Sequence, residues 1–279
     1  MSDLKERGEL TKGEVETIKE QAKRELENCG KMTDIIGTQI FPILTRYARV
    51  IYYPLGTDKD DPWGFTRIQG NVSKEEKKPF VVINTSIPTD CRVFAAAHEL
   101  YHICYEKKTG EVPADVMDDK QQNRDELRAN RFAAEFLAPE KLLRQELQFY
   151  GITKDCVDIK TILQMAEAFC IPYRAMVKRL YEIGEISNEQ KTQLLEKSEA
   201  DVEIARRRYS LPVPGADERI AIDNLVELAV EAYSKRLITY ERLEYLLEFD
   251  NLTPAAVGIK APKAYTPPSD DELDHLMEE

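Results

Sequence analysis

The chain has 279 residues, of which 42% are hydrophobic and 32% are charged, and its formal net charge at pH 7 is −12. This length and composition predict a globular protein with one main domain and a smaller appendage. This negative net charge argues against direct nucleic-acid binding, because a protein that neutralises phosphates needs a basic surface. The sequence shows no apolar run of transmembrane length and no apolar signal-peptide core, so we expect a cytoplasmic protein with no membrane partner.

Helical patterns precede strand patterns in the first third of the chain. A capping box at Thr11 to Glu14, followed by apolar residues at helical spacing, predicts a helix over 13–28, and a second helix is expected over about 34–47. Three short segments then combine β-branched and aromatic residues, which predicts three strands separated by loops. They are ARVIYYP at 48–54, GFTRIQG at 64–70 and FVVINT at 80–85.

The apolar spacing from Pro88 onward is helical almost throughout. An α+β fold follows, mostly helical and with a small sheet of about three strands. The stretch LPVPGADE at 211–218 is expected to be a linker, and an acidic tail, expected to be disordered, begins at about 260. The helices predicted over this region span roughly 89–106, 123–138, 139–150, 158–169, 172–183, 187–208, 218–235 and 239–248.

Two of the three histidines in the chain lie four residues apart in AAAHELYHICYE at 95–106. On a helix, His98 and His102 project side by side about 6 Å apart along the axis, as two ligands of one zinc ion require. Glu99 lies roughly 100° around the helix from His98, where a carboxylate reaches a water molecule without being a ligand. The competing interpretation is a pair of structural histidines in the core, which would need no third ligand.

A catalytic zinc site requires a third protein ligand, and the next strong helical segment, NRDELRANRFAAEFLAPE at 123–140, offers carboxylates. Glu126 stands one turn before its apolar stripe, and Asp125 is almost as well placed by periodicity alone. Glu135 is expected on a solvated face together with Arg128 and Arg131.

The residues HELYH at 98–102 and ELRANRFAAEFLAP at 126–139 resemble the ImmA/IrrE family of zinc metallopeptidases. That family shows HExxH and, some two dozen residues later, ExxAN leading into FAAxxLxP. The strand FVVIN at 80–84 and the segment ILQMAEAFCIPYRAMVKRLYEIGEIS at 162–187 are also similar to the family pattern. The resemblance covers about residues 32–187.

The resemblance implies that His98, His102 and Glu126 bind Zn²⁺, with Glu126 preferred over Asp125, and that Glu99 is the general base. Asn130, four residues after Glu126, is then well placed to orient a ligand by a hydrogen bond; a helix-surface amide is the alternative. The implied fold is a zincin-like metallopeptidase domain over residues 1–186, which includes the helix pair 158–183. Residues 187–279 would form a helical C-terminal region that ends in the acidic tail.

The function expected from these observations is a cytoplasmic zinc endopeptidase whose protein substrate is, by resemblance, a DNA-binding repressor of a mobile element or stress response. The substrate is expected to lie extended along a sheet edge near FVVIN. One alternative is a metal-binding regulator that inactivates the repressor without proteolysis. Another is a DNA-binding protein with a structural metal, because the helix pair resembles a helix-turn-helix whose second helix carries basic residues. These residues are Arg174, Lys178 and Arg179.

Overall fold

The structure is a computed structural model that describes residues 10–58, 60–67, 78–106, 111–113, 124–153 and 157–262. Its internal contacts divide the chain into two units, Met1–Asp223 and Asn224–Glu279, which are described separately below. This division lies further along the chain than the predicted boundary after residue 186. Nearly all of the predicted acidic tail lies outside the described residues.

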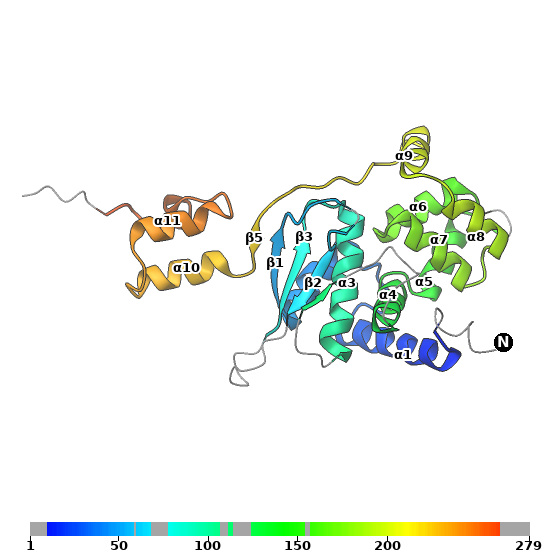
Figure 1. Ribbon diagram of the computed structural model, residues 1–279, viewed down its shortest axis with the longest axis horizontal. Coiled ribbons are helices and arrows are strands. Elements are labelled where there is room, and N and C mark those ends of the chain that lie inside the picture. The colour runs from blue at the N-terminus through cyan, green and yellow to red at the C-terminus, as the bar shows by residue number, and fades with distance from the viewer. Residues whose placement is uncertain are drawn as a thin grey trace, which may run out of the picture. The chain divides into compact units, whose positions relative to one another are not determined.

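The first unit contains a five-stranded sheet in the order β4-β2-β3-β1-β5 (Figure 1). The central pair, β1 and β3, is parallel, and the remaining pairs are antiparallel. The predicted α+β fold is confirmed, and two short edge strands accompany the three expected ones. The strands are β1 (Arg49–Tyr53), β2 (Gly64–Arg67), β3 (Phe80–Asn84), β4 (Glu111–Pro113) and β5 (Ala221–Ile222).

The segment FVVIN forms β3, which lies between β2 and β1 and is hydrogen-bonded on both sides. FVVIN itself is therefore not an edge to which a substrate could add a strand, and the expected substrate path along a nearby edge stays a prediction. The sequence did not reveal this, because strands paired in chain order would leave FVVIN at an edge, whereas β1 pairs in parallel with β3 on the side away from β2.

Helix α3 packs against β2, β3 and α2, and α4 packs against both α3 and α1 (Figure 1). The small side chains of Ala95, Ala96 and Ala97, all fully buried, let α3 approach its neighbours closely. Phe132 of α4 stacks on Phe136 and packs against Tyr101 of α3. These helices are α1 (Lys12–Asn28), α2 (Ile40–Tyr47), which follows a 3-10 turn at Gly37–Gln39, α3 (Thr89–Tyr105) and α4 (Arg124–Leu137).

Five further helices follow in the part of this unit that the structure describes. The predicted helix over 187–208 is two helices, because Ser198 and Asp201 form a second capping box that begins a new helix. Because α8 packs against α7 and α9 packs against α6, both belong to the first unit. The five are α5 (Glu140–Phe149), α6 (Ile159–Phe169), α7 (Tyr173–Glu182), α8 (Asn188–Leu195) and α9 (Glu199–Arg208).

The predicted linker at 211–218 is anchored to the sheet region rather than free. Arg92 donates to Asp217 over 2.8 Å, and the Glu218 N–H donates to the carbonyl oxygen of Thr85 over 3.1 Å. The chain then forms β5 beside β1, so that this segment closes one edge of the sheet.

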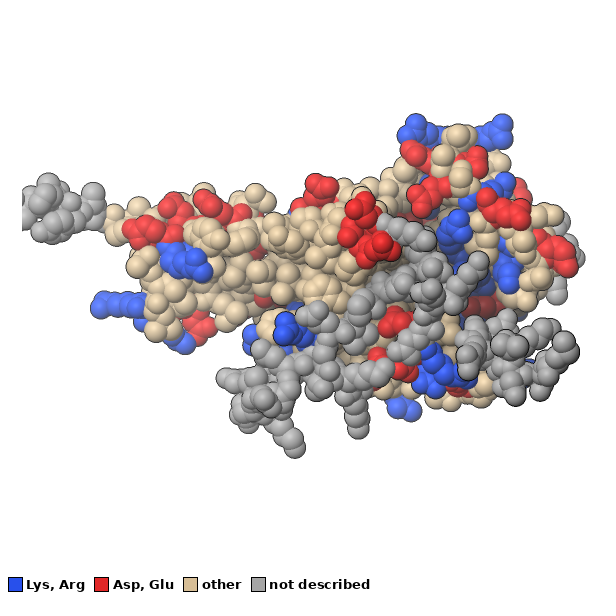
Figure 2. All heavy atoms as spheres, in the orientation of Figure 1, with Lys and Arg blue, Asp and Glu red and all other residues tan. Residues whose placement is uncertain are grey.

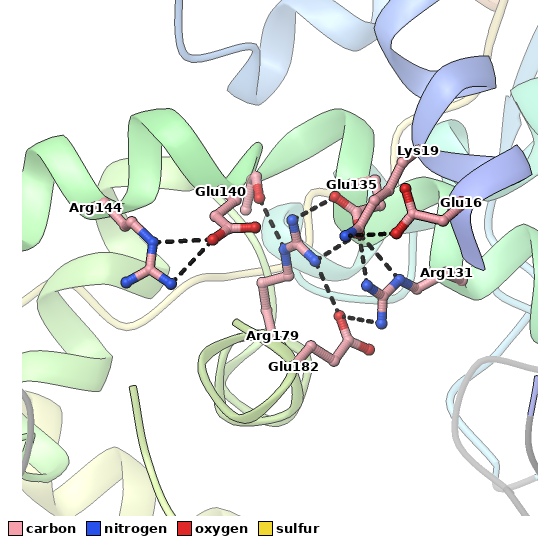
Figure 3. Close-up of polar contacts among 9 residues, drawn as sticks. Glu16, Lys19, Arg131, Glu135, Glu140, Arg144, Arg179 and Glu182 are labelled. Carbon is pink, nitrogen blue, oxygen red and sulfur yellow. Dashed lines mark hydrogen bonds and ion pairs between the residues drawn. The ribbon is translucent and has the colours of Figure 1, made fainter. Parts of the chain in front are cut away.

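A buried ion network joins α4 to α7 (Figure 3). The guanidinium of Arg179 donates to the Glu135 carboxylate and to the carbonyl oxygen of Ala138, and Arg131 donates to Glu135 as well. The expectation of a solvated Glu135 is wrong, because this side chain is 6% exposed and the Arg179 side chain is fully buried. A buried carboxylate is tolerated here because two guanidinium groups compensate its charge.

The second unit is a small helical hairpin with its own core of Ala229, Leu243 and Leu247. Its described residues form α10 (Leu225–Ser234), α11 (Tyr240–Glu248) and a 3-10 turn at Pro254–Val257. The predicted helix over 218–235 begins later than expected because residues 221–222 form β5. In the parts of both units that the structure describes, no helix has the length and apolar character needed to cross a bilayer.

Candidate metal centre

Three buried side chains from two helices converge on one point between α3 and α4. Nε2 of His98 lies 3.0 Å from Nε2 of His102 and 3.0 Å from Oε2 of Glu126. Oε1 of Glu126 lies 3.6 Å from Nε2 of His102. Helical spacing places the two histidines one turn apart on α3, and Glu126 faces them from the first turn of α4.

The far side of each imidazole faces a hydrogen-bond acceptor. Nδ1 of His98 lies 2.9 Å from Oδ1 of Asn130, and Nδ1 of His102 contacts the carboxylate of Glu106. With a metal ion at the centre, each ring would carry its proton on Nδ1 and present the lone pair of Nε2 to the ion. Ligands of metal ions are commonly oriented by such outer hydrogen bonds.

The donor set fits a divalent metal ion. Two Nε2 lone pairs and a carboxylate face one another at 3.0 to 3.6 Å, an arrangement that is repulsive unless a cation compensates it. Ligand atoms around a tetrahedral zinc ion lie about 3.3 Å apart, which agrees with this spacing. Burial alone disfavours a charged imidazole, yet the contact with Glu126 leaves the pKa of His98 raised. The centre therefore favours positive charge.

Glu99 lies beside this cluster and is fully buried. The hydroxyl of Thr66 in β2 donates to its Oε2 over 2.6 Å, whereas its Oε1 has no hydrogen-bond partner. Burial raises the pKa of Glu99 to about 7, against the opposing effects of His98 and the Thr66 hydrogen bond. A carboxyl group with a pKa near neutrality is suited to accepting a proton and returning it.

Asp125, the rival of Glu126, does not join the cluster. Its Oδ1 accepts a hydrogen bond of 3.0 Å from Arg128 on the same helix. The two residues that the sequence analysis missed are Glu106 and Thr66. Glu106 stands four positions after His102, so helical spacing offered a signal for it. Thr66 reaches Glu99 through strand pairing, which no local pattern in the sequence indicates.

A cavity of about 630 Å³ lies elsewhere in the first unit. Its lining includes Trp63, Asp90 at the start of α3, Arg174 of α7 and Arg206 of α9, and it contains none of the three cluster residues. Asp90 and His98 are eight residues apart on one helix, about 12 Å along its axis. The metal centre and this cavity are therefore distinct places.

The fold and the site together define a metallopeptidase-type domain: an HExxH helix packed on a small sheet, with a carboxylate from the next helix completing a buried metal-binding group. Residues 48–181 match the family model for peptidase M78, described as the IrrE N-terminal-like domain. This part of the chain belongs to that family, which confirms the resemblance to ImmA/IrrE metallopeptidases and implies a protein substrate. None of the curated proteins matches the chain.

Proposed function

We propose that the chain is a zinc endopeptidase in which His98, His102 and Glu126 bind the ion and Glu99 is the general base. The observation that carries this proposal is the convergence of three lone-pair donors within 4.8 Å of one another in a buried site of a peptidase domain. When bound, zinc would supply a Lewis acid that polarises the scissile carbonyl and increases the acidity of water.

The protein's own side chains supply orientation and proton transfer. Glu99 follows His98 directly, so its carboxylate accepts the proton of the attacking water and later returns it to the leaving amine. Asn130 and Glu106 contact the rings of His98 and His102 at their Nδ1 atoms, which would keep both Nε2 lone pairs directed at a bound metal ion.

The substrate we propose is a helix-turn-helix repressor of a mobile element or stress response, which would place the reaction in the cytoplasm. This proposal rests on the family resemblance. An extended substrate segment is held by main-chain hydrogen bonds where a sheet offers an edge. Among the described strands the sheet ends at β4 and at β5, and we take β4 as the edge for such pairing because it lies beside β2, whose Thr66 contacts Glu99.

Direct DNA reading by α7 is a weaker candidate function. Of its three basic residues, Arg179 is buried and pairs with Glu135, so it cannot contact a phosphate or a base. Figure 2 shows Lys and Arg side chains mixed with Asp and Glu over the helices α6 to α9. The described residues on this face therefore form no continuous basic surface. Phosphate recognition depends on such a surface.

The decisive experiment is incubation of the protein with the repressor encoded beside its gene, with and without a chelator. We expect cleavage that the chelator abolishes. The Glu99→Gln variant should bind zinc and fail to cleave, while Asp125→Asn, a matched change outside the cluster, should cleave at the wild-type rate. Unchanged cleavage by Glu99→Gln would refute the mechanism. Release of the repressor from DNA by Glu99→Gln, without cleavage, would instead identify a non-proteolytic regulator.

A further inference from the structure

The contact between Thr66 and Glu99 joins the sheet to the HExxH helix. The two residues are 33 positions apart in the chain, and their hydrogen bond of 2.6 Å lies in the interior. Thr66 is 1% exposed and Glu99 is fully buried. Solvent therefore does not compete for this bond, and the hydroxyl holds one oxygen of the carboxylate.

The position of the hydroxyl is itself fixed by the sheet. Thr66 pairs with Val81 of β3 on one side and with Val112 of β4 on the other. A Cβ atom at Gly64, two residues earlier, would lie 2.9 Å from the carbonyl oxygen of Val82, so β2 approaches β3 closely there, and 3.7 Å from Cγ of Glu99, which is ordinary contact. Threonine is also stiff about its first side-chain torsion. The donor therefore has little freedom to move.

The two oxygens of the Glu99 carboxylate are not equivalent. Oε2 accepts the Thr66 hydrogen bond, whereas Oε1 is buried and has no hydrogen-bond partner. A buried acceptor without a partner is costly, and a catalytic role is one of the explanations for such a group in a native structure. The unpartnered oxygen is the one left available for a reacting group.

We propose that Thr66 is a positioning residue: it holds Oε2 of Glu99 so that Oε1 is the oxygen that exchanges the proton. This inference rests on the proposed peptidase function. Oε1 takes a proton from the water whose oxygen forms the new C–O bond. It then gives that proton to the amine nitrogen as the C–N bond breaks, so Glu99 returns to a carboxylate.

The test compares Thr66→Val, which keeps the shape and removes the hydroxyl, with Thr66→Ser, which keeps a hydroxyl. The probe is a pooled library of internally quenched fluorescent peptides, from which one peptide cleaved by the wild type is taken for kinetics. We expect Thr66→Val to lower kcat about 10- to 100-fold, the effect of a misplaced catalytic group, with KM and zinc content unchanged. Thr66→Ser should restore most of kcat.

A matched control separates the loss of this contact from the loss of any buried hydroxyl. Thr85 is also fully buried, and its hydroxyl donates to the carbonyl oxygen of Arg219 over 2.8 Å. Thr85→Val should lower stability and leave kcat unchanged. The proposal is overturned if Thr66→Val keeps the wild-type kcat, if Thr66→Ser is as slow as Thr66→Val, or if the loss in kcat follows a loss of zinc.

A second measurement needs no substrate. In metal-free protein, Thr66→Val should lower the urea midpoint when Glu99 is present and should not lower it in a Glu99→Leu background. Only when Glu99 is present does the loss of the Thr66 hydroxyl leave a buried carboxylate without its hydrogen-bond donor. Equal shifts of the urea midpoint in both backgrounds would show that Thr66 does not act through Glu99 and would overturn the proposal. If the wild type cleaves no peptide and no repressor, the proposed function fails, and this cycle still decides whether Thr66 holds Glu99.

Discussion

Replacement of Glu106 by Gln should weaken zinc binding by about 30- to 100-fold, or about 2 to 2.7 kcal/mol. The Glu106 carboxylate contacts Nδ1 of His102 and thereby increases the basicity of the ring and fixes its orientation. The Glu106 side chain is only 11% exposed, so solvent replaces little of the lost charge, and the upper part of the range is expected. The amide in Gln keeps the size of the side chain and removes its charge.

The assay is a competition titration against a chromophoric zinc chelator at fixed ionic strength. Asp125→Asn is the matched control, because it also removes one carboxylate charge, and Asp125 stands next to Glu126 in the chain but pairs with Arg128 instead of a histidine. Its zinc affinity should stay within about twofold of the wild type, which is less than 0.5 kcal/mol. A Glu106→Gln variant with wild-type affinity would show that Glu106 does not support the metal site.

Three further predictions concern stability. Arg179→Leu should lower the free energy of unfolding in urea by about 3 to 5 kcal/mol, because it leaves part of the buried Glu135 charge uncompensated. The double variant Arg179→Leu/Glu135→Leu should recover most of the loss. A single variant whose free energy of unfolding stays within about 1 kcal/mol of the wild type would contradict this. Burial raises the pKa of Glu135, but Arg179 and Arg131 leave it below its usual value. The stabilisation is therefore present above the unfolded pKa of about 4.3 and is lost as the pH falls, so the wild type should lose more stability than Glu135→Gln between pH 6 and 3. A chelator should lower the thermal midpoint of the wild type and leave that of Glu126→Gln almost unchanged, because only a site that binds metal in the native state is stabilised by it.

The part of the site that lies on single helices followed from local spacing. His98 and His102 are four residues apart, so any helix over this segment brings them together. The choice of Glu126 over Asp125 did not follow from spacing, because both fall near the same edge of α4. The resemblance favoured Glu126, and in the structure Glu126 faces both imidazoles while Asp125 turns to Arg128.

The features that could not be predicted depend on contacts between distant segments. Glu135 has the spacing of a surface residue on α4, but Arg179 of α7 covers it. Thr66 belongs to a strand whose partners decide which face its side chain occupies. The break before α9 could have been predicted from the sequence, because Ser198 and Asp201 form a local capping box. The prediction of one long helix over 187–208 did not take this box into account.

Anomalous diffraction at the zinc edge, from crystals of the zinc-loaded protein, would locate the metal ion. We expect one peak about 2.0 to 2.2 Å from Nε2 of His98, Nε2 of His102 and a carboxylate oxygen of Glu126. A peak bound elsewhere, or a Glu126 side chain turned away from the two rings, would contradict it.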